Sequence, residues 1–249
     1  MTEPAVPIDN PAGRLYDILN RIKQSNSGWT VVYALPGILL VDPNDAIGVF
    51  YAFTQLKGLI DDTDLAIEKL EGYKYKRYQK MIERIKIAFQ DLNYEVKLQD
   101  ILKYLNDDTL LSLKHCAEDL SGTEIYIDGD ALKELQAEVN SLLEKVIESN
   151  ELGKEIRTFL YEKLQEIDKA IGDYRFYGAV GIRRAFESSL GAALINQEQI
   201  QEQKENKLVK EFFKVLIKID SILSPFVKAK QLIPPGMIQF FLKSGNSDS

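Results

Sequence analysis

The helical character of this chain is clearest in residues 207–224, which read KLVKEFFKVLIKIDSILS. Four lysines in this stretch recur every three or four residues, so on a helix they form one narrow stripe. These lysines are Lys207, Lys210, Lys214 and Lys218. Most of the other positions are large and apolar, which makes the apolar arc wider than a helix needs in order to sit on a core. The pattern predicts an amphipathic helix with one basic edge.

Three interpretations of this helix remain open at the level of sequence. The favoured one is a core helix whose lysines reach water. The second is a docking surface for another chain, and the third is a helix that lies on anionic lipid with its lysines among the headgroups. A helix that spans the bilayer is excluded, because three lysines would sit at depth. The interaction site of the two alternatives comprises Lys207, Lys210, Phe212, Phe213, Lys214, Leu216 and Lys218.

Charge is distributed unevenly along the chain. The whole sequence of 249 residues holds 31 basic and 38 acidic residues, for a net charge of -7. Residues 204–243 hold eight lysines and three acidic residues, so an acidic body carries a basic, apolar end. The acidic total argues against nucleic acid as a partner of the whole surface. With no targeting signal near the amino terminus, we expect a cytoplasmic protein.

The remaining chain shows helical spacing of apolar residues almost throughout. It predicts an all-α, multi-helix bundle of seven to nine helices with short connections and little or no strand. Asn10 before Pro11, Asp128 and Asn150 are the expected helix caps. In the helix expected over residues 43–70, Ile47 and Phe50 are among the residues expected to point inward. The expected helices cover residues 11–24, 43–70, 76–92, 96–105, 109–120, 128–149, 150–171, 174–195 and 197–224.

The sequence contains no clear domain boundary. No linker of low complexity divides the chain, so we expect a single helical domain over residues 1–249. A subdivision near residues 121–129 is the alternative. Residues 123–128, TEIYID, are the one short stretch with strand-like residues.

Few motifs point to chemistry. Asp61, Asp64 and Glu68 share a helix face and would suit Mg²⁺ in an all-α enzyme, although a solvated acidic face is the favoured interpretation. The single His and single Cys, His115 and Cys116, are adjacent and therefore do not face each other on a helix. We expect no metal site and no cofactor.

Small residues form a second pattern, along the helix expected over residues 174–195. They let two helices approach closely, either inside the fold or across a homodimer seam. The stripe consists of Gly178, Gly181, Ala185, Ser188 and Ala192.

The function that these patterns favour is a non-enzymatic interaction or regulatory protein. It would act through helix packing, with a protein partner or with a second copy of itself. One alternative is a membrane-acting effector or toxin-like protein that uses the helix at 207–224. A weaker alternative is a Mg²⁺-dependent all-α enzyme that uses the face of Asp61, Asp64 and Glu68.

Overall fold

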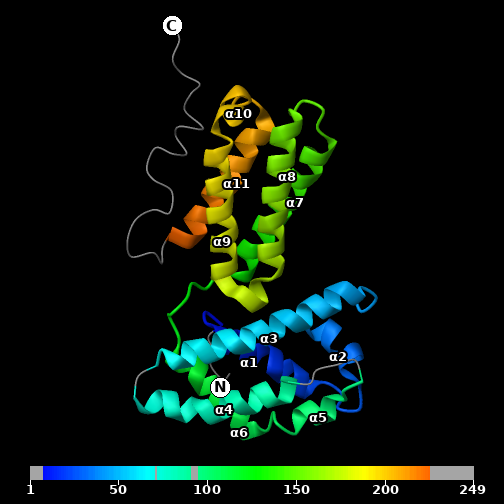
Figure 1. Cartoon of the computed structure of the whole chain (residues 1–249), viewed down its shortest axis with the longest axis vertical. Helices are drawn as coiled ribbons and strands as arrows, with labels where there is room; N and C mark the ends of the chain where they lie inside the picture. Colours follow the sequence, from blue (N-terminus) through cyan, green and yellow to red (C-terminus); the bar gives the residue numbers. More distant parts are fainter. Residues whose placement is uncertain (1–7, 71, 91–94, 225–249) are drawn as a thin grey trace. The chain divides into compact units, whose positions relative to one another are not determined.

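The computed structural model describes residues 8–70, 72–90 and 95–224. These residues form eleven α-helices, which confirms the all-α class and exceeds the predicted seven to nine helices (Figure 1). The single β-type pairing among them is one antiparallel bridge between Thr30 and Lys97. Packing divides the chain into two compact units, with the division between Glu124 and Ile125. The expectation of one domain stays a prediction.

Unit 1 contains the first six helices. Helix α1 packs against α3 and α6, and α4 also packs against α3 and α6, so four helices enclose one core. The largest fully buried side chains of this core include Tyr78, Phe89 and Leu56. The helices are α1 (Pro11–Gln24), α2 (Val31–Ile38), α3 (Ala46–Glu68), α4 (Tyr73–Gln90), α5 (Leu98–Leu102) and α6 (Asp107–Asp119).

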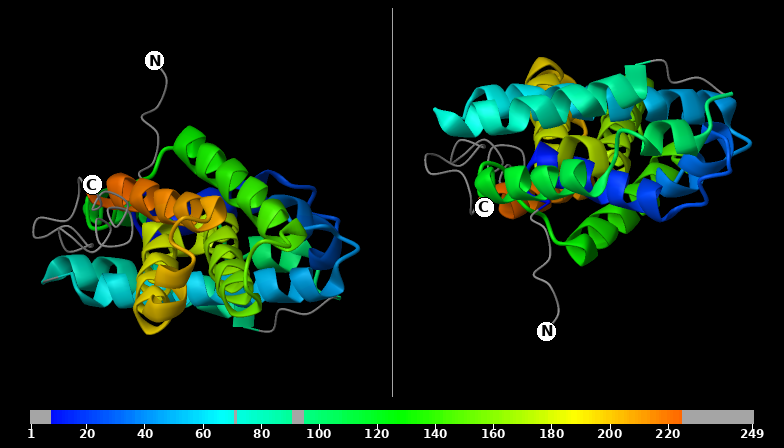
Figure 2. Two further views of the ribbon diagram at one scale, coloured as in Figure 1. Left: turned by 90° about the horizontal axis from the view of Figure 1, so that it is seen from above. Right: turned by 90° about the horizontal axis from the view of Figure 1, so that it is seen from below.

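Unit 2 is a four-helix bundle with one short connecting helix. Neighbouring pairs are α7 with α8, α8 with α9, α9 with α11, and α11 with α7. The view from above in Figure 2 shows α7 and α11 on one side and α8 and α9 on the other. The helices are α7 (Gly129–Glu148), α8 (Lys154–Gly172), α9 (Tyr174–Ile195), α10 (Gln197–Glu202) and α11 (Lys207–Leu223).

The helix caps follow the sequence at two of the three predicted positions. The Asn10 side chain accepts a hydrogen bond from Gly13 N at 2.9 Å, and Pro11 is the first helical residue. Asp128 caps α7 through Asp130 N at 3.1 Å. The predicted cap at Asn150 is wrong, because α8 begins at Lys154 with Gly153 at its cap.

Two expected helices are interrupted. The helix expected over residues 197–224 is two helices, α10 and α11, because the Asn206 side chain accepts from Leu208 N at 2.8 Å and starts a new helix. Within α9, Gly178 has φ 58° and ψ -152°, which breaks the helical geometry. The strand-like residues 123–128 form no strand.

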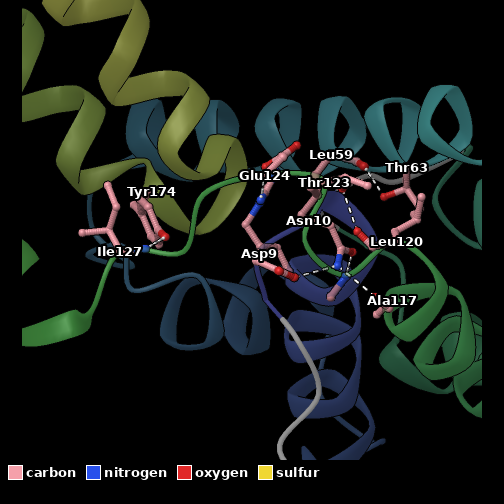
Figure 3. A network of polar contacts seen from close by, with 12 residues as sticks. Asp9, Asn10, Leu59, Thr63, Ala117, Leu120, Thr123, Glu124, Ile127 and Tyr174 are labelled. Carbon is pink, nitrogen blue, oxygen red and sulfur yellow. Dashed lines mark hydrogen bonds and ion pairs between the residues drawn. The ribbon is translucent and has the colours of Figure 1, made fainter. Parts of the chain in front are cut away.

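The two ends of unit 1 meet. The Asn10 Nδ2 atom donates to Ala117 O at 3.0 Å, and Gly122 N donates to Asp9 Oδ2 at 2.7 Å (Figure 3). In unit 2, Ile127 N donates to the Tyr174 hydroxyl at 2.8 Å. Residues on either side of the division are therefore each tied to their own unit.

Candidate functional site

The apolar members of the predicted interaction site lie inside unit 2. Phe212, Phe213 and Leu216 are buried in its core. The Phe212 ring packs edge-on against Phe159 at a centroid distance of 5.5 Å and against Phe213 at 5.6 Å. A docking or lipid-binding surface made of these three side chains would require them to leave that core.

The lysines of α11 are largely paired with acidic side chains. Lys210 Nζ lies 2.5 Å from Glu205 Oε2, and Lys207 Nζ lies 3.8 Å from Glu211 Oε1. Lys218 Nζ lies 2.6 Å from Glu138 Oε1 on α7. The hydrogen bond to this carboxylate raises the pKa of Lys218.

This pairing reduces the charge that the stripe offers to an anionic surface. Of the four lysines, only Lys214 has no ion pair with the residues that the structure describes. The part of the basic segment after residue 224 lies outside the described residues.

The acidic cluster of α3 is partly neutralised by one lysine of α4. Lys86 Nζ lies 2.5 Å from Asp64 Oδ2 and 3.7 Å from Asp61 Oδ1. The hydrogen bond that Lys86 donates to Asp64 raises the pKa of Lys86. Across residues 8–70, 72–90 and 95–224, no three or more His, Cys, Asp or Glu side chains are grouped in a way that would hold a metal ion.

The small-residue stripe of α9 does not lie on one buried face. Gly178 and Ala185 are buried, Gly181 and Ala192 are half-buried, and Ser188 is exposed. A Cβ added to Gly181 would lie 2.9 Å from Tyr177 Cβ, which belongs to the same helix. Gly181 therefore relieves crowding inside α9, and the homodimer seam stays a prediction.

Cys116 and His115 show no reactive arrangement. Cys116 is fully buried, and this burial raises the pKa of its thiol to about 12. A thiol with a raised pKa is a poor nucleophile, because the thiolate is the reactive form. The His115 ring contacts Glu118, one helical turn away: its Nδ1 atom lies 3.0 Å from Glu118 Oε2.

The aromatic and basic residues at the start of α4 include one core residue. Tyr78 is fully buried, and its hydroxyl donates to Asp119 Oδ2 at 2.6 Å. Burial is the main cause that raises the pKa of Tyr78, followed by this hydrogen bond. The Tyr78 ring is therefore unavailable for stacking on a nucleic-acid base.

Two shallow hollows lie between helices. One of about 310 Å³ lies between α3 and α4 and is lined in part by Asp61 and Lys86, which pair with each other. The other, of about 380 Å³ between α7 and α11, is lined in part by Lys145 and Glu211, whose Nζ and Oε2 atoms are 3.1 Å apart. In each hollow, one pair of opposite charges is therefore already partnered within the protein.

The four most exposed apolar side chains of unit 1 belong to α2, to the connection after it and to the first turns of α3. Tyr33 is 76% exposed, Leu40 69%, Ile47 83% and Phe50 65%. The two helices pack against each other, and Figure 1 shows α2 beside the first turns of α3. We name these four residues the α2–α3 face.

Helical spacing accounts for the exposure of only some of these side chains. Tyr33 lies in the first turn of α2, whereas Leu40 follows the end of that helix with a positive φ of 51°. Ile47 and Phe50 are three residues apart in the first turns of α3. Val49, Ala52 and Phe53 fill the opposite side of α3 and face the core.

The prediction that Ile47 and Phe50 point inward is therefore wrong. The start of α3 is apolar on more sides than the core can cover, so periodicity alone does not show which side is buried. A signal that was present in the sequence is the absence of positive charge: residues 24–56 contain no Lys, Arg or His.

The connection between the two helices carries negative charge. The only charged residues between 24 and 56 are Asp42 and Asp45, which lie in the connection between the two helices. Both are exposed. Asp45 accepts from Gly48 N at 2.9 Å and caps α3, and Asp42 accepts from Asn44 N at 2.9 Å. The α2–α3 face is thus an apolar surface with two fixed carboxylates at its edge.

Comparison of the chain with models of protein families, with curated proteins and with solved structures gives no match in any of the three. Among the helices that the structure describes, none combines the length and the apolar character that crossing a membrane would require.

Proposed function

We propose that this chain is a non-enzymatic interaction protein, and that its α2–α3 face binds an apolar, basic helical segment of a partner protein. The observation that carries the proposal is the exposure of four large apolar side chains, from 65% to 83%, within α2, the connection after it and the first turns of α3. Contiguous exposed apolar patches on soluble domains mark interaction sites, whereas single exposed apolar residues do not.

Burial of these side chains provides the driving force for binding. Covering one large apolar side chain contributes about 1.5–3 kcal/mol. Aromatic residues such as Tyr33 and Phe50 are common anchors of protein interfaces, because each buries a large area with few rotatable bonds. Four such residues next to one another are enough to anchor a short helix.

The charge distribution selects the chemistry of the partner. Asp42 and Asp45 would attract lysine or arginine at the edge of a bound segment. An acidic segment of equal apolar content would meet like charge. A basic, apolar segment is therefore the preferred ligand.

The experiment uses a defined probe in place of a natural partner. It is a labelled amphipathic peptide of about 18 residues, or about five helical turns, made of leucine, alanine and lysine. A second peptide has glutamate in place of every lysine. Fluorescence anisotropy should show binding of the lysine peptide to the full chain, and much weaker binding of the glutamate peptide.

The variant Phe50→Ala should weaken binding of the lysine peptide about tenfold or more, because one apolar anchor is lost without a change of charge. Leu111→Ala is the matched control: Leu111 is 53% exposed and is, like Phe50, the fifth residue of its helix. It should bind like the wild type. Equal binding by both variants, or no preference for the lysine peptide, would contradict the proposal.

A further inference from the structure

We infer that the hollow between α7 and α11 binds a small amphipathic molecule with one carboxylate and an alkyl chain, of the kind of a medium-chain fatty acid. The hollow has a volume of about 380 Å³, which is at the small end of the range for small-molecule sites. It lies within unit 2, so this inference does not depend on the docking surface proposed for unit 1.

Two ion pairs between the helices flank the hollow. Lys145 Nζ of α7 lies 3.1 Å from Glu211 Oε2 of α11. Lys218 Nζ of α11 lies 2.6 Å from Glu138 Oε1 of α7. Residue numbers fall along α7 as they rise along α11, so the two helices are antiparallel. On each helix the two pairs are seven residues apart, a distance of about 10 Å, which sets the length of the site.

Apolar side chains lie between these ion pairs. Leu142 and Val215 line the hollow, and both belong to the core of unit 2. Ala137, the third apolar residue of the lining, has only a methyl side chain. An alkyl chain would cover these groups, and each methylene that leaves water should raise the affinity by up to about fourfold. The apolar lining therefore favours an alkyl chain over a polar ligand.

Lys214 provides the positive charge of the site. Among the charged residues that line the hollow, it is the one without an ion pair in the part of the chain that the structure describes. It lies near the midpoint between the two ion pairs along α11, and Ser141 lies near the midpoint along α7. At this level, a serine occupies the position on α7 where an acidic residue could pair with the lysine.

A ligand carboxylate would take the place of that missing acid. It would accept a charge-assisted hydrogen bond from Lys214 Nζ and a hydrogen bond from the Ser141 hydroxyl, with its alkyl chain on the apolar lining. Glu138 and Glu211 also line the hollow and would repel a second negative charge. The site therefore suits a monoanion better than a phosphate dianion.

Calorimetric titration of the full chain with decanoate tests this inference. The wild type should bind one decanoate, and should bind octanoate about fivefold or more weakly because two methylenes are missing. Decan-1-ol has the same chain without the charge and should bind about tenfold or more weakly. Failure of decanoate to bind, or equal binding of decan-1-ol, would overturn the inference.

Two variants locate the bound carboxylate. Lys214→Gln should weaken decanoate binding about tenfold or more, because the charge-assisted hydrogen bond is lost. Lys133→Gln is the matched control: it removes the same charge from α7, at an exposed lysine that does not line the hollow. Its affinity for decanoate should equal that of the wild type. Equal affinities of Lys214→Gln and Lys133→Gln would place the ligand elsewhere and overturn the inference.

The variant Ser141→Glu places an acidic side chain at the level of Lys214. Ser141 is exposed, so the fold should accept the change. The new carboxylate should pair with Lys214 and abolish decanoate binding, while the midpoint of thermal unfolding stays the same or rises. Decanoate binding by Ser141→Glu with the affinity of the wild type would contradict the assignment of this site.

Discussion

Phe212 is a core residue of unit 2 and belongs to the apolar side of α11. Its ring lies between Phe159 of α8 and Phe213 of its own helix, with both neighbours edge-on. Aromatic pairs in this geometry add to the free energy gained by burial alone. Because Phe212 is fully buried, the wide apolar arc of α11 contributes to the stability of unit 2.

Phe212→Ala should lower the free energy of unfolding by about 3–5 kcal/mol, because it removes a buried ring and leaves a cavity. The matched control is Ile217→Ala on the same helix, where the side chain is 36% exposed. Its cost should be less than about 1 kcal/mol. Urea unfolding followed by circular dichroism measures both. Equal costs would show that the arc of α11 is not packed as described.

Cys116 makes stability depend on pH in the alkaline range. Burial raises the pKa of its thiol in the folded state to about 12. The unfolded thiol ionises at a lower pH, so its contribution to stability is complete below about pH 9 and is lost as pH rises through the folded pKa. Over that window the loss should be about 1.4 kcal/mol for each pH unit.

The variant Cys116→Ala isolates this contribution from other groups that titrate in the same range, such as Tyr78. Urea unfolding between about pH 8 and about pH 10 should show a steeper decline for the wild type than for Cys116→Ala. Parallel pH profiles of the two proteins would mean that the thiol is accessible to water in the folded state.

Helix α9 shows how a single backbone position shapes an element. Gly178 has φ 58° and ψ -152°, a region of backbone conformation that is open to glycine and strained for other residues. Phe176 and Ala179, on either side of it, are both buried. Sequence periodicity treats this glycine as an ordinary small residue, which is why a continuous helix was expected.

Two glycine substitutions in α9 should therefore have opposite signs. Gly178→Ala should lower the free energy of unfolding by about 1–3 kcal/mol or more, because alanine is strained in this conformation. Gly191→Ala should raise it by about 0.5–1 kcal/mol, because an added Cβ meets no atom within 4 Å in the helix interior. Thermal unfolding of both variants measures the difference. Stabilisation by Gly178→Ala would contradict the kink.

Helix boundaries were predictable where a side chain satisfies the first free amides. Asn10 and Asp128 are caps of this kind. Each is a short polar residue directly before a helical pattern, which is the usual sequence signal of a helix start. The break before α11 was missed although Asn206 is a capping residue, because the polar residues around it also fit a continuous helix. Asn150 was wrongly assigned because Gly153 can start a helix without a side-chain acceptor.

For the molecule as a whole, the sequence predicted the helical class but not the surface of greatest interest. The regular spacing of the lysines of α11 predicted an interaction surface. In the structure, acidic residues outside the stripe pair with these lysines, and two of the acidic residues belong to α7. The α2–α3 face depends on which sides of two helices the core covers, and a single sequence does not contain that information. Residues 24–56 gave only the indirect signal of missing cations.

The most direct test of the docking surface is calorimetric titration of the full chain with the lysine peptide at several temperatures. Burial of apolar surface on binding gives a negative change in heat capacity. We expect a clear negative value for the wild type and for Leu111→Ala, and a smaller negative value for Phe50→Ala, which buries less apolar area. Binding with no heat-capacity change, or the same change in Phe50→Ala as in the wild type, would contradict the α2–α3 face as the docking surface.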